Sequence, residues 1–414
     1  MPTDYITSAA TKTAIEAILK EKWVTEEIQR QYARDRVLLA ILEKDSRQVD
    51  GLESVFTMRL EPNSSTGARG EMQDLPDAGR QTTKKCRIPL SYWYTVCAFS
   101  GQAIKASNNS ATAIAKIIAD EMQNAVEDHK RVENAYLYGD GSGALAQVED
   151  VDTTNKKIKV TLWNNLFTPG RYIETASTKA GTDASITMNA NRIVDVDRAT
   201  RMLTLASPLV VGTLTPDDDD YVFLKGTRGN ANMGLMGICD DGGIVSTFQG
   251  LSRTDYPQIK AKVFDNSGTG RNISESILMG VVARMREDGA TPDIIIGTSF
   301  QLKDLCAEMH SQRRFIDDGG KLDLGVKGIK IGDGIDFTFD LDCPPGYAFA
   351  LNRKNIKMSE AAPLSFMDLD GNVMSRINSK DAYEATLFHY FNLIALSCYD
   401  QARIEDLNEN RVGD

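Results

Sequence analysis

The sequence predicts an α+β fold in which a long β-hairpin, one long helix, a small β-rich segment and an α/β unit follow one another. Two runs with the two-residue period of strands flank a polar, glycine-rich stretch from Pro62 to Thr83. An amphipathic helical pattern follows from Ser110 to Tyr138, and a helix–strand–helix pattern occupies Glu275 to Met309. With 42% hydrophobic and 25% charged residues, the 414-residue chain has the balance of a globular protein with a sizeable core.

Composition argues against several classes of function. The formal charge of −11 opposes the phosphate contacts that drive nonspecific DNA binding, although it would suit a wall that only encloses DNA. No apolar run approaches the roughly 18 to 20 residues that span a bilayer, and the start lacks a secretory signal pattern. We therefore expect synthesis in the cytosol and no membrane contact. The six cysteines form no C-x-x-C pair, which favours buried thiols over disulfides or a zinc site.

The first elements expected are a charged helical arm, from Thr11 to Lys44, and then the two legs of the hairpin. Loops as long as the polar tip between the legs are usually functional or disordered. In the outgoing leg, three apolar residues alternate with polar ones: Phe56, Met58 and Leu60. The return leg is expected to carry five apolar residues on one face: Ile88, Leu90, Tyr92, Tyr94 and Val96.

Basic side chains are concentrated on this expected hairpin. Such a group is either a solvated charged surface or a contact with an acidic surface on an adjacent subunit, and the pattern leaves both interpretations open. The six residues are Arg59, Arg69, Arg80, Lys84, Lys85 and Arg87.

The amphipathic pattern after the hairpin predicts one helix, capped by Asn108, Asn109 or Ser110 and ended by Gly139. A continuous helix from Ser110 to Tyr138 would be roughly 43 Å long, which is long enough to act as a structural spine. Apolar residues recur at three- and four-residue spacing and are expected to face the core. They include Ile114, Ile118, Met122 and Val126.

The remaining chain predicts two further parts. From Gln147 to Lys225, short β-patterned runs are separated by polar turns, as in a small barrel or sandwich inserted into a larger domain, with Asp217–Asp220 as an exposed loop. After Gly243, helical patterns at Glu275–Glu287 and from Ser299 enclose the apolar strand Pro292–Gly297. Later strands are expected at Ile335–Leu341, Tyr347–Leu351 and Phe388–Asp400.

Motifs for catalysis or metal binding are missing from the sequence. His129, His310 and His389 lie far apart without a metal-ligand spacing, so each is interpreted as a surface or core histidine. The glycine-rich run Gly139–Gly143 follows a helix, whereas a phosphate loop follows a strand, and the residues around Gly371 lack the spacing of a calcium loop. We expect no catalytic residue, no cofactor and no metal, and hence no enzyme.

Taken in order, these elements resemble the major capsid proteins of tailed bacteriophages, which have the Hong Kong 97-like fold. Residues Glu133–Gly141 resemble the end of that family's spine helix. Residues Gly234–Ile238 resemble the short segment that leads the chain back into the main domain. Residues Ser276–Leu305 resemble the helix, strand and helix of the axial domain. The segment 147–225 departs from the minimal family pattern, although some relatives carry inserted β domains.

The resemblance implies a division of the chain into seven parts. These are an N-terminal helical arm (1–50), an extended hairpin loop (51–100), a peripheral domain with the spine helix (101–146), an inserted β domain (147–225), a return to the peripheral domain (226–245), an axial α/β domain (246–380), and closing strands with a C-terminal tail (381–414).

It also implies a function in the virion. Copies of the chain would assemble in the host cytoplasm into an icosahedral shell of hexamers and pentamers that encloses double-stranded DNA without sequence-specific binding. The expected partners are other copies of the chain, a portal protein, a separate scaffold protein and a cement or decoration protein. No propeptide is expected, and covalent cross-linking through Lys84 or Lys85 is not predicted.

Two alternatives remain open at this point. An encapsulin-type shell of the same fold would hold protein cargo instead of a genome. An α/β enzyme with an accessory β domain would need a catalytic constellation that the sequence does not show. A β-rich adhesion module fits the long helix poorly.

Overall fold

The computed structural model describes residues 37–46, 49–63, 65–74, 76–102, 111–180, 185–210, 214–312, 329–331, 334–368 and 373–409. Most of the expected helical arm and the expected helix caps Asn108–Ser110 lie outside these residues. The described chain divides into two compact units. Unit 1 comprises Tyr92–Glu133 and Glu360–Phe391, and unit 2 comprises Val37–Ser91, Asn134–Ser359 and the residues from Asn392 onwards.

Unit 1 is built from a long helix and a sheet. Helix α4, Ala111–Tyr136, has 26 residues and is therefore about 39 Å long, which confirms the expected spine helix. The sheet contains β5 (Ser91–Ser100), β21 (Ala382–Ala395), β20 (Ser375–Arg376) and β19 (Ile356–Phe366), with β21 paired to the other three. Strand β21 starts earlier than the expected Phe388–Asp400, and the sequence pattern did not predict β19.

A small hydrophobic core holds unit 1 together. It joins Cys97 and Phe99 of β5 to Ala125 of α4 and Ala385 of β21, with Met122 packed against it. Met122 thus lies on the core face as expected, and Val126 is half-buried. Ile114 and Ile118 are on the helix, but their side chains are outside the described residues.

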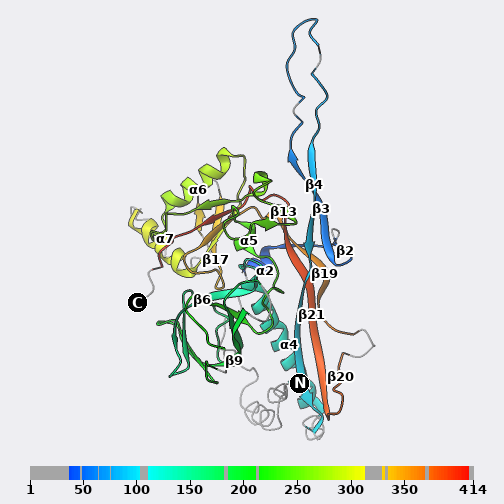
Figure 1. The fold of residues 1–414 in the computed structure, drawn as a ribbon, viewed down its shortest axis with the longest axis vertical. Helices are drawn as coiled ribbons and strands as arrows, with labels where there is room; N and C mark the ends of the chain where they lie inside the picture. Colours follow the sequence, from blue (N-terminus) through cyan, green and yellow to red (C-terminus); the bar gives the residue numbers. More distant parts are fainter. Residues whose placement is uncertain are drawn as a thin grey trace, which may run out of the picture. The chain divides into compact units, whose positions relative to one another are not determined.

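In unit 2, the expected hairpin is confirmed. Strands β3 (Glu53–Glu61) and β4 (Thr82–Pro89) pair antiparallel, and β2 (Val49–Asp50) adds a third strand. Figure 1 shows the pair extending beyond β13 (Leu251–Ser252), which pairs with β12 (Thr247–Phe248). Cys86 lies in a buried cluster with Leu251 and Ile259, against which Phe56, Met58 and Leu60 also pack.

The expectation that the return leg keeps one buried face through Val96 is wrong. The hairpin leg ends at Pro89, and β5 pairs with β21 instead. Leu90 and Ser91 are both buried, so the alternation shifts by one residue at this change of partner. Consequently Ile88 is buried, whereas three residues expected on its face are exposed: Tyr92, Tyr94 and Val96.

The β insertion is a closed barrel of six strands in the order β10-β7-β6-β11-β8-β9. Its strands are β6 (Ala144–Asp152), β7 (Lys157–Val160), β8 (Tyr172–Ala176), β9 (Ile186–Asp197), β10 (Met202–Leu205) and β11 (Tyr221–Leu224). Ile158, Leu203 and Val222 are fully buried, which is consistent with a barrel filled by side chains. In the acidic run, Asp217–Asp219 are exposed as expected, but Asp220 is buried and its carboxylate accepts a hydrogen bond from the backbone N–H of Asp217 at 2.9 Å.

The expected α/β unit is confirmed in its helices and central strand. Helices α6 (Glu275–Glu287) and α7 (Ser299–Gln312) flank strand β15 (Ile294–Gly297) in the sequence. Ser274 caps α6, because its hydroxyl accepts a hydrogen bond from the backbone N–H of Ile277 at 3.2 Å. The sheet has the order β14-β22-β18-β15-β17-β16. Its other strands are β14 (Lys262–Phe264), β22 (Ala402–Ile404), β18 (Ala348–Leu351), β17 (Ile335–Phe339) and β16 (Ile329–Ile331).

Short elements complete unit 2. They are α2 (Val37–Ile41), β1 (Glu43–Asp45), α5 (Leu235–Ile238), β12 (Thr247–Phe248), β13 (Leu251–Ser252) and the 3-10 turns η3 (Pro257–Ile259) and η4 (Arg353–Asn355). Within the described ranges, no helix combines the length and the apolar character that crossing a membrane requires.

A buried ionic centre connects several of these elements. Asp240, which follows α5, contacts Arg253 after β13 at 3.1 Å and Arg403 of β22 at 3.4 Å. All three side chains are at most 4% exposed. The Arg253 guanidinium also donates to the carbonyl oxygens of Gly237 and Ile238 in α5, at 2.8 and 3.2 Å. Such a centre is costly to break, because each charge depends on the others for compensation.

Candidate functional site

The structure presents the six expected contact residues of the hairpin to the outside. All six are exposed: Arg59, Arg69, Arg80, Lys84, Lys85 and Arg87. Arg87 contacts Glu53 across the strand pair at 3.4 Å, and the Lys84 ammonium lies 5.5 Å from the ring centre of Tyr256. Arg59, Arg80 and Lys85 make no ion pair within the described part of the chain. Their charges are therefore available to another molecule.

The charges of the hairpin are unevenly distributed along its length. Four of the six basic residues lie on β3 and β4, and those on β4 are Lys84, Lys85 and Arg87. Acidic residues gather where the strands end and in the tip between them: Glu61, Glu71, Asp74 and Asp77. In the described part of the tip, the hydrogen bonds are local, such as that from Arg69 to the carbonyl oxygen of Asp74 at 2.9 Å. The hairpin thus offers a basic stem and a polar tip of mixed charge.

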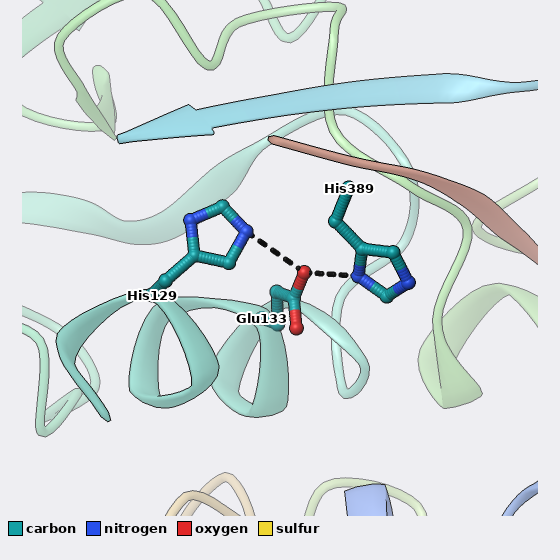
Figure 2. A group of neighbouring side chains, drawn as sticks. All are labelled: His129, Glu133 and His389. Atoms are coloured by element: carbon teal, nitrogen blue, oxygen red, sulfur yellow. Dashed lines mark hydrogen bonds and ion pairs between the residues drawn. The ribbon is translucent and has the colours of Figure 1, made fainter. Parts of the chain in front are cut away.

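Unit 1 contains a second group of interest, which the sequence analysis missed. His129 and Glu133 are one helical turn apart on α4, so their side chains lie on the same face. His389 reaches them from β21, where its side chain is 1% exposed. Figure 2 shows both imidazole rings directed at one carboxylate oxygen of Glu133. Nε2 of His129 lies 3.0 Å from this oxygen, Oε1, and Nδ1 of His389 contacts it more closely.

The ring nitrogens that face away from Glu133 also have polar partners. Nδ1 of His129 is 2.7 Å from the hydroxyl of Thr95 on β5. Nε2 of His389 is 2.8 Å from Oε1 of Glu360 on β19. Burial raises the pKa of the Glu133 carboxyl, but the two imidazoles outweigh this and hold the pKa below its ordinary value. Glu133 is therefore a buried carboxylate between two histidines.

The sequence left His129 and His389 open as surface or core histidines, and the structure buries both, with exposures of 3% and 1%. The expectation that they lie far apart is wrong. The structure brings both onto Glu133, and the atoms facing one another form a group that could hold a metal ion. The spacing of His129 and Glu133 on a predicted helix was the available signal. His389 lies 256 residues beyond Glu133, and only the fold brings the two together. The side chain of His310 lies outside the described residues.

One of the cavities of unit 2 has a volume of about 240 Å³. Its polar groups include Lys179, whose ammonium lies 2.7 Å from the carboxylate of Asp140. Burial raises the pKa of the Asp140 carboxyl, but the contacts with Lys179 and Ser142 lower it by more, so the pKa lies below its ordinary value. These structural partners keep the carboxyl ionised. The described residues that line this cavity include no histidine, cysteine or serine.

The comparisons with known proteins find similarity in structure and none in sequence. No protein-family model and no curated protein sequence matches the chain. The structure is similar to a protein of the cyanophage A-1(L) capsid asymmetric unit, with a TM-score of 0.59 and 12% sequence identity. The match covers 93% of this chain and 96% of that one.

Two further solved structures match with TM-scores of 0.45 and 10% identity, too low to support an argument. One is the SrpI encapsulin from Synechococcus elongatus PCC 7942, and the match covers 96% of this chain and 97% of the encapsulin chain. The other is a protein of Gordonia phage Cozz, which covers 99% of both chains. The cyanophage match over nearly the whole chain carries the conclusion: the chain has the fold of tailed-phage capsid proteins, the Hong Kong 97-like fold.

Proposed function

We propose that this chain is the major capsid protein of a tailed phage and that its copies assemble into an icosahedral shell of hexamers and pentamers around double-stranded DNA. One observation carries the proposal: the likeness to the cyanophage capsid protein extends over 93% of the chain. A likeness that covered only the α/β unit would be weaker, because single folds serve many functions. The formal charge of −11 is compatible with a wall that encloses DNA without binding it tightly.

The hairpin would supply a main contact between neighbouring subunits. Its basic stem is complementary to a chain that is acidic overall, and opposite charges guide such contacts into register. Met72 in the tip is fully exposed and gives the hairpin an apolar group for the same contact. Many weak copies of one contact can together hold a closed shell, while each stays reversible enough for errors to be corrected during assembly.

The finer assignments follow from this function. The peripheral domain would contain the spine helix α4, the axial domain would contain the α/β unit and meet its copies at the capsomer centre, and the barrel would decorate or brace the shell. A portal protein, a separate scaffold protein and a cement or decoration protein would be the partners, and the mature location would be the virion. An encapsulin-type shell is the second candidate, because its members share this fold.

Electron microscopy of the purified chain, alone and together with the structural proteins encoded beside its gene, tests the proposal. Uniform closed shells are expected under at least one of these conditions, and persistent monomers under both would contradict it. The contents of the shells separate the two candidates: nuclease-protected DNA in particles from infected cells supports a phage capsid. Protein cargo without DNA would establish the encapsulin alternative.

The contact made by the hairpin is tested by two changes. Deleting residues 64–81 should leave the monomer folded, because the hydrogen bonds described in the tip are local, but should prevent stable shells. Lys85→Glu should weaken assembly, since Lys85 is exposed and without an ion pair in the described part of the chain. Lys260→Glu is the matched control, because it makes the same charge change at an exposed lysine outside the hairpin. Normal shells from the deletion variant, or equal assembly of both lysine variants, would contradict the proposed contact.

A further inference from the structure

Three atoms able to bind a metal converge inside unit 1. Nε2 of His129, Oε1 of Glu133 and Nδ1 of His389 all lie within 4.8 Å of one another. Metal–ligand bonds of about 2.0 to 2.2 Å, as for zinc, place neighbouring tetrahedral ligands roughly 3.3 Å apart. The separation of 3.0 Å between His129 and Glu133 is close to this value. A small movement of the side chains would therefore open the group around an ion.

The outer nitrogens of both rings already have partners, as they do in metal sites. A histidine that binds a metal usually donates its other ring N–H to a carboxylate or another oxygen, which fixes the tautomer and the ring orientation. Here His389 faces the Glu360 carboxylate through Nε2, and His129 faces the Thr95 hydroxyl through Nδ1. Figure 2 shows the inner nitrogens of both rings facing Glu133. With the protons on the outer nitrogens, each inner nitrogen would present a lone pair to a metal ion.

The inner nitrogen of His129 supplies an independent observation. It is buried, and its contact with the Glu133 oxygen at 3.0 Å is an ion pair that lacks good hydrogen-bond geometry. Buried polar atoms nearly always have a well-aligned partner, so this nitrogen calls for an explanation. A bound cation would satisfy it together with the other two atoms.

We propose that His129, Glu133 and His389 bind one divalent transition-metal ion, for which Zn²⁺ is the best fit. Two imidazoles and one carboxylate are ligands typical of zinc, whereas Ca²⁺ and Mg²⁺ require mainly oxygen ligands. The ion joins helix α4, which carries two ligands, to strand β21, which carries the third. It therefore stabilises unit 1 by linking the spine helix to the sheet, and this holds whether or not the chain forms a phage shell.

The first test measures the metal content of the intact chain. Protein produced in zinc-supplemented medium and purified without chelator should retain about one Zn²⁺ per chain by elemental mass spectrometry, because the ligands are at most 1 to 2% exposed. After stripping and reloading with Co²⁺, the visible spectrum should show the absorption bands of a cobalt ion with nitrogen and oxygen ligands. The proposal is overturned if the protein retains less than a tenth of a Zn²⁺ ion per chain and shows no Co²⁺ bands. The three side chains would then be joined by hydrogen bonds alone.

Two substitutions assign the ion to these residues. His129→Asn places an amide nitrogen where Nδ1 faces Thr95, and His389→Gln places one where Nε2 faces Glu360, but both remove the inner ligand atom. Replacing a residue that only hydrogen-bonds to a metal ligand typically lowers metal affinity roughly 10- to 100-fold, and Thr95→Val should lower the Zn²⁺ affinity by this amount. His129→Asn and His389→Gln each remove a ligand and should lower it by more. Circular dichroism checks that each variant is folded. Unchanged Zn²⁺ affinity in folded His129→Asn and His389→Gln would place the ion elsewhere and overturn the proposal.

Discussion

Replacing Asp240 with Asn should destabilise unit 2 strongly, because this single carboxylate compensates much of the charge in the buried centre. Its two oxygens accept hydrogen bonds from five donors, namely the guanidinium groups of Arg253 and Arg403 and the backbone N–H groups of Gly242, Ile244 and Val245. Asn keeps the shape of the side chain but removes its charge and directs an amide N–H₂ at donors. Burial already lowers the pKa of the Arg253 guanidinium, so that group tolerates the loss of a counter-ion poorly.

The size of the effect follows from the burial of the partners. Arg253 is 1% exposed and Arg403 3%, and removing one partner of such a pair costs about 3 to 5 kcal/mol. Arg403 retains a contact with Glu405 at 2.6 Å, so most of the loss falls on Arg253. For a cooperative unit of roughly 300 residues, the unfolding entropy is near 0.6 kcal/mol per kelvin, and a loss of about 4 kcal/mol lowers the Tm by about 6 °C.

The assay is thermal unfolding of unassembled protein at one fixed concentration, since assembly would itself shift the Tm. Asp241→Asn is the matched control, because Asp241 is the neighbouring residue, is exposed and accepts a single hydrogen bond from the backbone N–H of Gly243 at 3.1 Å. It should change stability by about 0.5 kcal/mol or less. If Asp240→Asn lowers the Tm no more than this control does, the buried centre does not stabilise the fold as argued.

Two further predictions concern thiols and glycines. Burial raises the pKa of the Cys398 thiol to about 12, so iodoacetamide at pH 8 should label the half-buried Cys306 well before Cys398 in the native chain, as peptide mass spectrometry would show; equal rates would contradict this. Gly234→Ala should lower the Tm by several degrees, because the added Cβ would lie 2.6 Å from backbone atoms of Gly139, which cannot move aside cheaply. Gly280→Ala, on helix α6 with no atom within 4 Å of the new Cβ, should instead raise stability by up to about 1 kcal/mol, and a loss there would refute the comparison.

Local signals predicted the elements whose sequence pattern and structural environment agree. Helix α6 has the predicted bounds Glu275–Glu287, because its apolar residues face the sheet at helical spacing and Ser274 caps its first turn. The β3–β4 hairpin was predictable because its legs alternate at the period of two. By contrast, β22 consists of only Ala402–Ile404, yet it lies inside the six-stranded sheet. A run of three residues has no periodicity, and its place depends on partners that lie far away in the sequence.

The candidate sites differ in the same way. Both interpretations of the hairpin's basic residues place them at the surface, and all six are exposed, because charged side chains are rarely buried without a partner. Of the group His129, Glu133 and His389, only the first two could be predicted to lie together. The spacing of four residues puts the first two on one helical face, but no pattern in β21 distinguishes His389 from other buried residues on that strand. Sites assembled from distant strands require knowledge of the fold.

The buried centres of the two units and the hairpin tip are stabilised in opposite ways. Units 1 and 2 each hold buried charged groups, at Glu133 and at Asp240, whose partners come from several elements, so each unit resists deformation. The hairpin tip, by contrast, makes mainly local contacts, and ordering its roughly 20 residues costs conformational entropy of about 1 kcal/mol or more per residue. If the proposed hairpin contact forms, the neighbouring subunit would have to offset this cost. The tip would then act in the contact between chains and contribute little to the stability of the free chain.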